Sequence, residues 1–174
     1  MQSLIAEDFK YRIMKNPITL IITAALLIVA NSAFAQLPVK PLAPQKKLLE
    51  SKDPKLAANK KLVYDMWREF LEGGHMEVAE KYFAEDYMQH NPTASTGRKA
   101  VVEVFSRFTK PQPVVDTIKA KVVSITAEGD LVTLGFVREL SEKEDKTKKY
   151  TTTWFDMFRV ENGKIAEHWD SATK

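Results

Sequence analysis

The chain has 174 residues, a formal net charge of +3 and no cysteine. The lack of cysteine excludes disulfides, thiol catalysis and cysteine-based zinc sites. Lysines and arginines are interleaved with acidic residues and form no basic stripe, which argues against nucleic acid as a partner.

The N-terminal segment has the pattern of an export signal. Basic residues precede an apolar run at 18–30, which is followed by Ala33-Phe34-Ala35, where signal peptidase needs small residues. The apolar run is shorter than the roughly 20 residues that span a membrane. Removal of the segment is therefore expected, and an uncleaved anchor is the alternative.

Cleavage between Ala35 and Gln36 would divide the chain into three parts. Residues 1–35 are the predicted signal peptide, with Met14 as a possible true start, residues 36–52 a flexible proline-containing tether, and residues 53–174 the folded domain. We expect the mature protein in the periplasm or outside the cell, with no membrane contact after signal removal.

Three helices are predicted in the first half of the domain. Asp53-Pro54 resembles an N-cap followed by proline at the first helical position. Apolar residues then recur every three or four positions up to Gly73-Gly74. A short helix is expected near 76–83 and a third near 98–109.

From Val114 the apolar spacing changes to the two-residue period of strands. The sequence predicts one strand through Ile118 and Val122, and further strands at 131–140, 150–160 and 164–171. The expected fold class is α+β: a curved antiparallel sheet of about four long strands, covered by three N-terminal helices that leave a cone-shaped pocket.

The last hairpin determines which side chains share a face, and two registers are open. A two-residue turn at Asn162-Gly163 would pair Glu161 with Lys164, whereas a three-residue loop would pair Val160 with Lys164. The three-residue loop is favoured. It would pair Phe158 with Ala166, Asp156 with His168, and Trp154 with Asp170, and so bring two carboxylates, an imidazole and an indole to one face.

Such a group suits proton-transfer chemistry. An aspartate in an apolar cavity has its pKa raised, because burial disfavours the charged form. It can then remove a proton alpha to a carbonyl, as the aspartate of ketosteroid isomerase does. A neighbouring His or Tyr can donate to the developing enolate oxygen. His90, before the third helix, could lie across the same cavity.

Two stretches carry a family resemblance. Tyr87-Met88-Gln89-His90-Asn91-Pro92 with Gly97-Arg98, and the C-terminal Phe155–Asp170 stretch that ends in Glu-His-Trp-Asp, resemble the SnoaL-like polyketide cyclases of the nuclear-transport-factor-2-like superfamily. The resemblance extends roughly from Asn59 to Ser171. It implies a cone-shaped α+β fold, a homodimer, and a cofactor-free intramolecular aldol condensation with an acid/base aspartate.

The resemblance also assigns residues. The aspartate of Glu-His-Trp-Asp corresponds to Asp170, the expected general base, and its partner on the adjacent strand to Asp156, where the cyclases can carry a histidine. The predicted catalytic set is Asp170, His168, Asp156 and His90, and the predicted ligand-binding set is Trp154, Tyr87, Asn91 and Phe158. No cofactor and no metal are expected, since His90, His168 and an aspartate have no metal-site spacing.

Purely structural interpretations of these residues compete with the catalytic and binding roles. Asp170 could be a capped residue at the sheet end, Asp156 with His168 a cross-strand ion pair, and His90 with Asn91 a loop closure. The leading hypothesis is an exported domain that binds a small, mostly apolar carbonyl compound and catalyses enolisation, aldol or isomerase chemistry. A non-catalytic binding module and a purely structural dimer, joined through Phe155, Met157 and Trp169, are the alternatives.

Overall fold

The computed structural model describes residues 37–172, so the predicted signal peptide lies outside the described part of the chain. From Pro38 onward the chain forms one compact unit. Within the described residues, no helix combines the length and apolar composition that crossing a bilayer demands.

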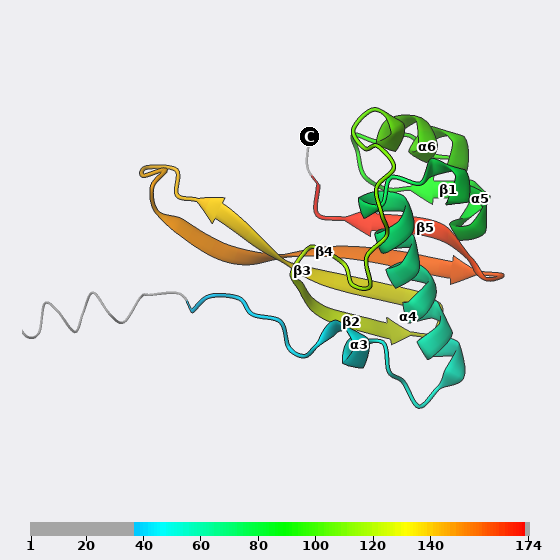
Figure 1. Ribbon diagram of the computed structural model, residues 1–174, viewed down its shortest axis with the longest axis horizontal. Coiled ribbons are helices and arrows are strands. Elements are labelled where there is room, and N and C mark those ends of the chain that lie inside the picture. The colour runs from blue at the N-terminus through cyan, green and yellow to red at the C-terminus, as the bar shows by residue number, and fades with distance from the viewer. Residues whose placement is uncertain (1–36, 173–174) are drawn as a thin grey trace, which may run out of the picture. The chain divides into compact units, whose positions relative to one another are not determined.

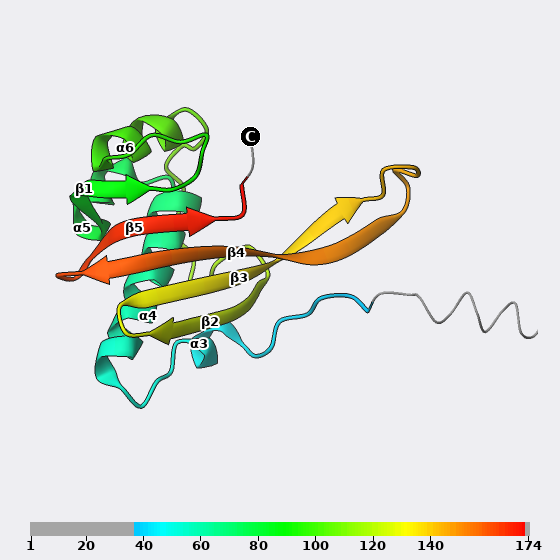
Figure 2. The ribbon, with the colours of Figure 1, turned by 180° about the vertical axis from the view of Figure 1, so that it is seen from behind.

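The unit consists of short and long helices packed against one sheet (Figures 1 and 2). The helical elements are α3 (Gln45–Leu48), α4 (Pro54–Met66), the π-helical η1 (Trp67–Glu72), the 3-10 helix η2 (Met76–Val78), α5 (Ala79–Tyr82) and α6 (Arg98–Ser106). The strands are β1 (Phe83–Gln89), β2 (Val122–Glu128), β3 (Leu131–Ser141), β4 (Lys149–Glu161) and β5 (Lys164–Asp170).

The strand order is β1-β5-β4-β3-β2, and the two edge strands do not meet, so the sheet stays open. The predicted α+β class and curved sheet are confirmed, with two corrections. The sheet has five strands, and it is mixed, because β1 runs parallel to β5. The predicted strand through Ile118 begins only at Val122.

The missed strand β1 explains the difference in topology. Its sequence contains Glu85 and Asp86, no β-branched residue and no strict alternation, so it lacks a local strand signal. Pairing with β5, about 80 positions later, makes it a strand: Met88 aligns with Glu167 and Gln89 with His168.

The long helix begins as the sequence predicts. Asp53 Oδ1 accepts hydrogen bonds from the backbone N–H groups of Lys55 (2.7 Å) and Leu56 (3.3 Å), with Pro54 at the first helical position. The helix continues directly into η1, and the chain turns away at Gly74, whose φ is 69°. The helix lies across one face of the sheet (Figure 1).

The segment predicted as a flexible tether, residues 36–52, contacts the domain through Leu42 and Gln45. The backbone N–H of Leu42 donates to the carbonyl of Val123 (3.0 Å). Gln45 of α3 donates from Nε2 to the carbonyl of Ile118 (2.9 Å) and accepts from the hydroxyl of Tyr64 (2.7 Å). Short hydrogen-bonded contacts of this kind carry no periodic sequence signal.

The register favoured for the last hairpin is wrong. Glu161 pairs with Lys164 across a two-residue turn, in which Asn162 and Gly163 both have positive φ (51° and 72°), as a type I′ turn requires. A bulge then leaves Ala166 unpaired, since Ile165 pairs with Val160 but Glu167 pairs with Arg159.

The two-residue turn and the bulge each shift the predicted pairing by one residue, and together they shift it by two. Beyond the bulge, Phe158 pairs with His168 and Asp156 with Asp170. Each pairing differs from the predicted one by two residues, and a two-residue shift leaves side chains on the same face. Asp156, Phe158, His168 and Asp170 therefore share the helix-covered face, as predicted, although their partners differ.

Candidate functional site

A cavity of about 580 Å³ lies between the sheet and the helices. Its apolar wall includes Trp67 and Leu71 from η1, and Val101 and Phe105 from α6. Phe108, beyond α6, lines it while remaining 80% exposed. The volume falls in the range of small-molecule pockets.

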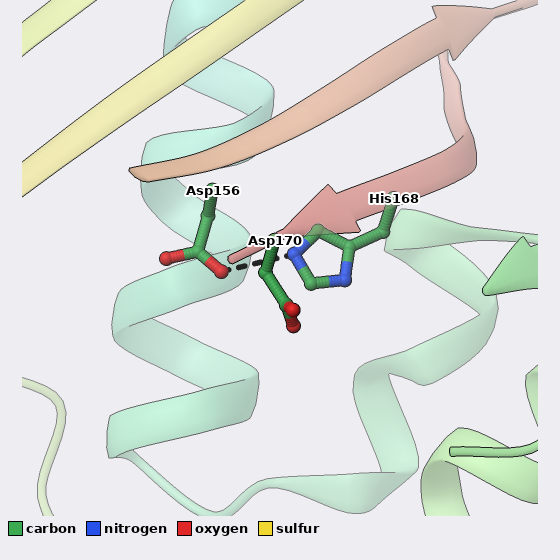
Figure 3. A group of neighbouring side chains, drawn as sticks. All are labelled: Asp156, His168 and Asp170. Carbon is green, nitrogen blue, oxygen red and sulfur yellow. Dashed lines mark hydrogen bonds and ion pairs between the residues drawn. The ribbon is translucent and has the colours of Figure 1, made fainter. Parts of the chain in front are cut away.

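Polar side chains converge on the cavity from three adjacent strands. β1 and the turn after it contribute Tyr87, Gln89 and Asn91, β4 contributes Asp156, and β5 contributes His168 and Asp170. Figure 3 shows Asp156, His168 and Asp170 gathered together, with the imidazole of His168 directed at Asp156. The cavity thus combines an apolar wall with one polar patch.

His168 has a partner on each ring nitrogen. Its Nε2 donates to Asp156 Oδ1 at 3.0 Å, and its Nδ1 lies 3.0 Å from Nε2 and 3.1 Å from Oε1 of Gln89. The ring also stacks on Phe158, with centroids 4.5 Å apart. His168 is 9% and Asp156 6% exposed, so the pair is buried inside the protein.

Asp156 keeps one unused acceptor. Its Oδ2 is buried and accepts no hydrogen bond from the residues that the structure describes. A buried polar atom without a partner costs about 1–3 kcal/mol. A donor group on a bound molecule would relieve that cost.

Asp170 is held by two donors. Asn91 Nδ2 donates to Asp170 Oδ2 at 2.8 Å, and the backbone N–H of Ala172 donates to Oδ1 at 2.7 Å. Asn91 is oriented in turn, because its Oδ1 accepts from the N–H and the hydroxyl of Thr93. The carboxylate therefore has a fixed orientation at the cavity surface, with further lone pairs free to accept.

Tyr87 supplies a buried hydroxyl beside these carboxylates. Its oxygen accepts from Gln89 Nε2 at 3.1 Å, and only 2% of the residue is exposed. Burial first, and then the charges of Asp170 and Asp156, raise the pKa of the Tyr87 phenol. The group keeps its proton at neutral pH and can donate it in a hydrogen bond.

His90 lies on the opposite face of the sheet. Its ring stacks on Trp169 (4.7 Å between centroids, 4° between planes), and its Nε2 donates to Glu167 Oε2 at 2.9 Å. It does not line the cavity, so the structure separates it from the other three predicted catalytic residues. Alternation along β1 and β5 accounts for this, because His90, Glu167 and Trp169 all point outward.

The predicted ligand-binding residues divide in the same way. Tyr87, Asn91 and Phe158 line the cavity, whereas Trp154 is not among its lining residues. The ring of Trp154 instead packs beneath the guanidinium of Arg138, at 4.6 Å. In the observed register Trp154 lies beyond the end of β5, because Asp170 already pairs with Asp156.

No role was predicted for Gln89, which connects three of the site residues, Tyr87, Asn91 and His168. Its place within Tyr87-x-Gln89-x-Asn91 would have indicated a shared face if the segment had been identified as a strand. The apolar wall from η1 and α6 was also expected only as core. Helical periodicity does not distinguish a core face from a cavity face.

The polar patch contains three potential metal ligands. Asp156, His168 and Asp170 place one potential ligand atom each within 4.8 Å of one another, the one such group found in residues 37–172. Hydrogen bonds already engage both nitrogens of His168, so its imidazole would have to release a partner to bind a metal ion. We therefore describe the group as a hydrogen-bonded cluster and assign no metal ligand.

Comparison with solved structures finds the same architecture elsewhere. A protein from Jannaschia sp. CCS1, described as a SnoaL-like polyketide cyclase, is 14% identical over 70% of this chain and 91% of its own, with a TM-score of 0.50. A polyketide cyclase candidate from Acidithiobacillus ferrooxidans is 18% identical over 70% and 89%, with a TM-score of 0.48. An epoxide hydrolase from M. tuberculosis, of the LEH-like type, is 15% identical over 65% and 80%, with a TM-score of 0.45.

At such identities the structural likeness concerns the fold alone. No curated protein matches the sequence. The model of the SnoaL-like domain family matches residues 64–168, which is more than half of the chain and includes β1, the hairpin and His168. The chain belongs to the SnoaL-like domain family.

Proposed function

We propose that the chain binds a small, mostly apolar carbonyl compound and transfers a proton at the carbon alpha to the carbonyl, without a cofactor. The observation that carries this proposal is the fixed carboxylate of Asp170 at the polar end of an otherwise apolar cavity. Enolisation, isomerisation and intramolecular aldol condensation all begin with this step.

Asp170 is the proposed base. The hydrogen bonds from Asn91 and Ala172 fix the carboxylate, and its remaining lone pairs can take a proton from carbon. The electron pair of the broken C–H bond forms a carbon–carbon double bond, and the π electrons of the carbonyl move to its oxygen, which gives an enolate. The proton then returns to another carbon, or the enolate carbon attacks a second carbonyl of the same molecule.

Tyr87 is the better-supported hydrogen-bond donor to the enolate oxygen. Its proton takes part in no hydrogen bond among residues 37–172, and burial keeps it in place. His168 has both nitrogens engaged and would have to break a hydrogen bond to donate. We therefore propose His168 and Asp156 as supports of the polar patch.

The assay requires no knowledge of the natural product. The purified chain is incubated in D₂O with a panel of cyclic ketones of increasing size, and deuterium uptake at the alpha carbon is followed by NMR. Asp170→Asn should slow the exchange at least about 100-fold, the usual contribution of a general base. Asp86→Asn, on the exposed face of β1, is the matched control and should retain the wild-type rate.

The rival is a non-catalytic binding module that uses the same cavity. Native mass spectrometry of the purified chain tests for a retained small molecule in both cases. Exchange that is equally fast in the wild type and in Asp170→Asn would remove Asp170 from the mechanism. A bound compound with no exchange by the wild type would favour the binding module.

Two further proposals concern the whole chain. We propose that it is exported and cleaved after Ala35, on the sequence pattern of the first 35 residues. We also propose a homodimer formed through the outer face of the sheet, because Phe155 is 48% and Met88 42% exposed there. Large exposed apolar side chains that gather on one face are typical of an interface.

A further inference from the structure

The side-chain amide of Gln89 meets His168 with both of its ends. Its Nε2 lies 3.0 Å and its Oε1 3.1 Å from Nδ1 of His168. One ring nitrogen therefore faces a donor and an acceptor at almost the same distance.

The orientation of this amide is fixed by other contacts. The backbone N–H of Asn91 donates to Oε1 at 2.9 Å, and only the oxygen end can accept it. Nε2 donates to the hydroxyl of Tyr87 at 3.1 Å. The amide is therefore held in one orientation, with a second proton on Nε2 and a second lone pair on Oε1 left for His168.

The far side of the imidazole has a constant partner. Nε2 of His168 must carry a proton to donate to Asp156 Oδ1 at 3.0 Å. In the neutral ring, Nδ1 then has a lone pair and accepts from Gln89 Nε2. In the imidazolium, Nδ1 carries a proton and donates to Gln89 Oε1. Neither form requires the ring or the amide to move.

The charge of His168 affects the polar patch because carboxylates lie close to it. Asp156 and Asp170 are directly opposite each other on β4 and β5, and Tyr87 faces both from β1. Glu72 of η1 also lines the cavity, but its carboxylate accepts from the N–H groups of Lys119 and Ala120. Uptake of one proton by His168 would offset one of the two facing carboxylates.

We propose that Gln89 is a positioning residue that holds His168 in the same place in its neutral and its protonated form. The charge of the polar patch can thus change by one while its geometry stays fixed. This inference rests on the proposed function only for its consequence: the protonated patch would tolerate an enolate better than the unprotonated one. The hydrogen-bond device itself is independent of turnover.

The test is an NMR titration of the imidazole ¹⁵N resonances in the full-length chain. The sequence contains only three histidines, so the His75→Asn and His90→Asn variants assign His168 directly. Gln89→Glu keeps the acceptor but loses the donor, which favours the imidazolium. Gln89→Met keeps the length but loses both, which leaves the buried charge without its acceptor.

The two variants should shift the midpoint of the His168 titration in opposite directions. We expect Gln89→Glu to raise it by about one pH unit or more and Gln89→Met to lower it. The neutral wild-type ring should carry its proton on Nε2. Gln112→Glu makes the same amide-to-carboxylate change at an exposed position and should leave the midpoint unchanged.

Two results would overturn the proposal. One is a midpoint that agrees within about 0.3 pH unit among the wild type and both Gln89 variants, since a one-unit shift is the effect expected from such a neighbour. The other is a neutral wild-type ring protonated on Nδ1. If Gln89→Glu does not fold, Gln89→Met and the wild-type tautomer still decide. If Asp170→Asn does not slow the exchange, Asp170 is not the general base, but the proposal for Gln89 and its titration test remain unaffected.

Discussion

The polar patch places two carboxylates opposite each other inside the protein. Asp156 and Asp170 are cross-strand partners, and like charges in that arrangement are destabilising. Each is held by a different donor: the imidazole of His168 bonds Asp156 and the amide of Asn91 bonds Asp170. Because each carboxylate accepts a hydrogen bond from its own donor, the two can lie opposite each other inside the protein.

The outer face shows a different use of charge. Glu167 accepts from His90 Nε2 at 2.9 Å and from Arg159 Nε at 2.6 Å. These two hydrogen bonds, that from His90 first, lower the pKa of the Glu167 carboxyl below its ordinary value of 4.5. The outward-pointing residues of the motif thus stabilise the strand pairing that holds the site.

This lowered pKa predicts an acid-dependent loss of stability. The contribution of Glu167 is complete above the pKa of an unfolded glutamate, and it disappears as the pH falls through the lower folded value. Glu167→Gln should therefore reduce the free energy of unfolding at pH 7, and the difference from the wild type should disappear as the pH falls below the folded-state pKa of Glu167. Urea unfolding at a series of pH values measures it.

Glu85→Gln is the control for that series. Glu85 is exposed on β1, and its substitution should follow the wild-type pH dependence. A Glu167→Gln protein that remains equally destabilised at the lowest pH would contradict the electrostatic explanation. A packing defect would then account for the loss.

Among the elements, those with local signals could be predicted from the sequence. The cap at Asp53 and the limits of β3 and β4 agree with the structure to within about one residue. β1 could not be found, because its pairing with β5 is non-local and the segment carries two acidic residues. The site was predicted in part: its shared face was found, but Gln89 and the outward direction of His90 depend on β1.

The cap of α4 gives a prediction at this scale. Asp53→Ala removes the side chain that accepts from the N–H groups of Lys55 and Leu56. The free energy of unfolding should fall by about 1 kcal/mol, the usual value of such a cap. Denaturant unfolding measures the loss. Asp116→Ala, at an exposed loop position, should change it by less than about 0.5 kcal/mol.

Although Asp53→Ala lowers the free energy of unfolding, it should leave the ketone exchange rate unchanged at temperatures where the protein stays folded. A stability equal to that of Asp116→Ala would show that the hydrogen bonds of the cap contribute no net stabilisation. Because α4 leads directly into η1, which forms part of the cavity wall, the helix start matters to the cavity through stability and not through contact.

For the whole molecule, the two faces of the sheet have different tasks. One face, with the helices, encloses the cavity, and the other exposes Phe155 and Met88 beside the half-buried Met157 and Trp169. Because an exposed apolar face of this kind favours association, the dimer proposal leads to a direct test.

Phe155→Lys should convert a dimer into a monomer in light scattering after size-exclusion chromatography, because it places a charge in the proposed interface. Phe108→Lys makes the same change at a more exposed aromatic residue, at the cavity, and should leave the mass unchanged. A wild-type protein that is monomeric at all accessible concentrations would exclude the dimer.

The bulge at Ala166 bears on how this hairpin can vary in evolution. Deletion of the bulged residue would leave His168 opposite Phe158 and Asp170 opposite Asp156, because those pairs lie beyond it. Deletion of two residues from this stretch would instead shift the pairing by one and turn the site residues outward. Homologues can therefore differ by one residue between the turn and the Glu-His-Trp-Asp motif and still keep the same cavity, and alignment of the motif should be anchored on β4 rather than counted from the turn.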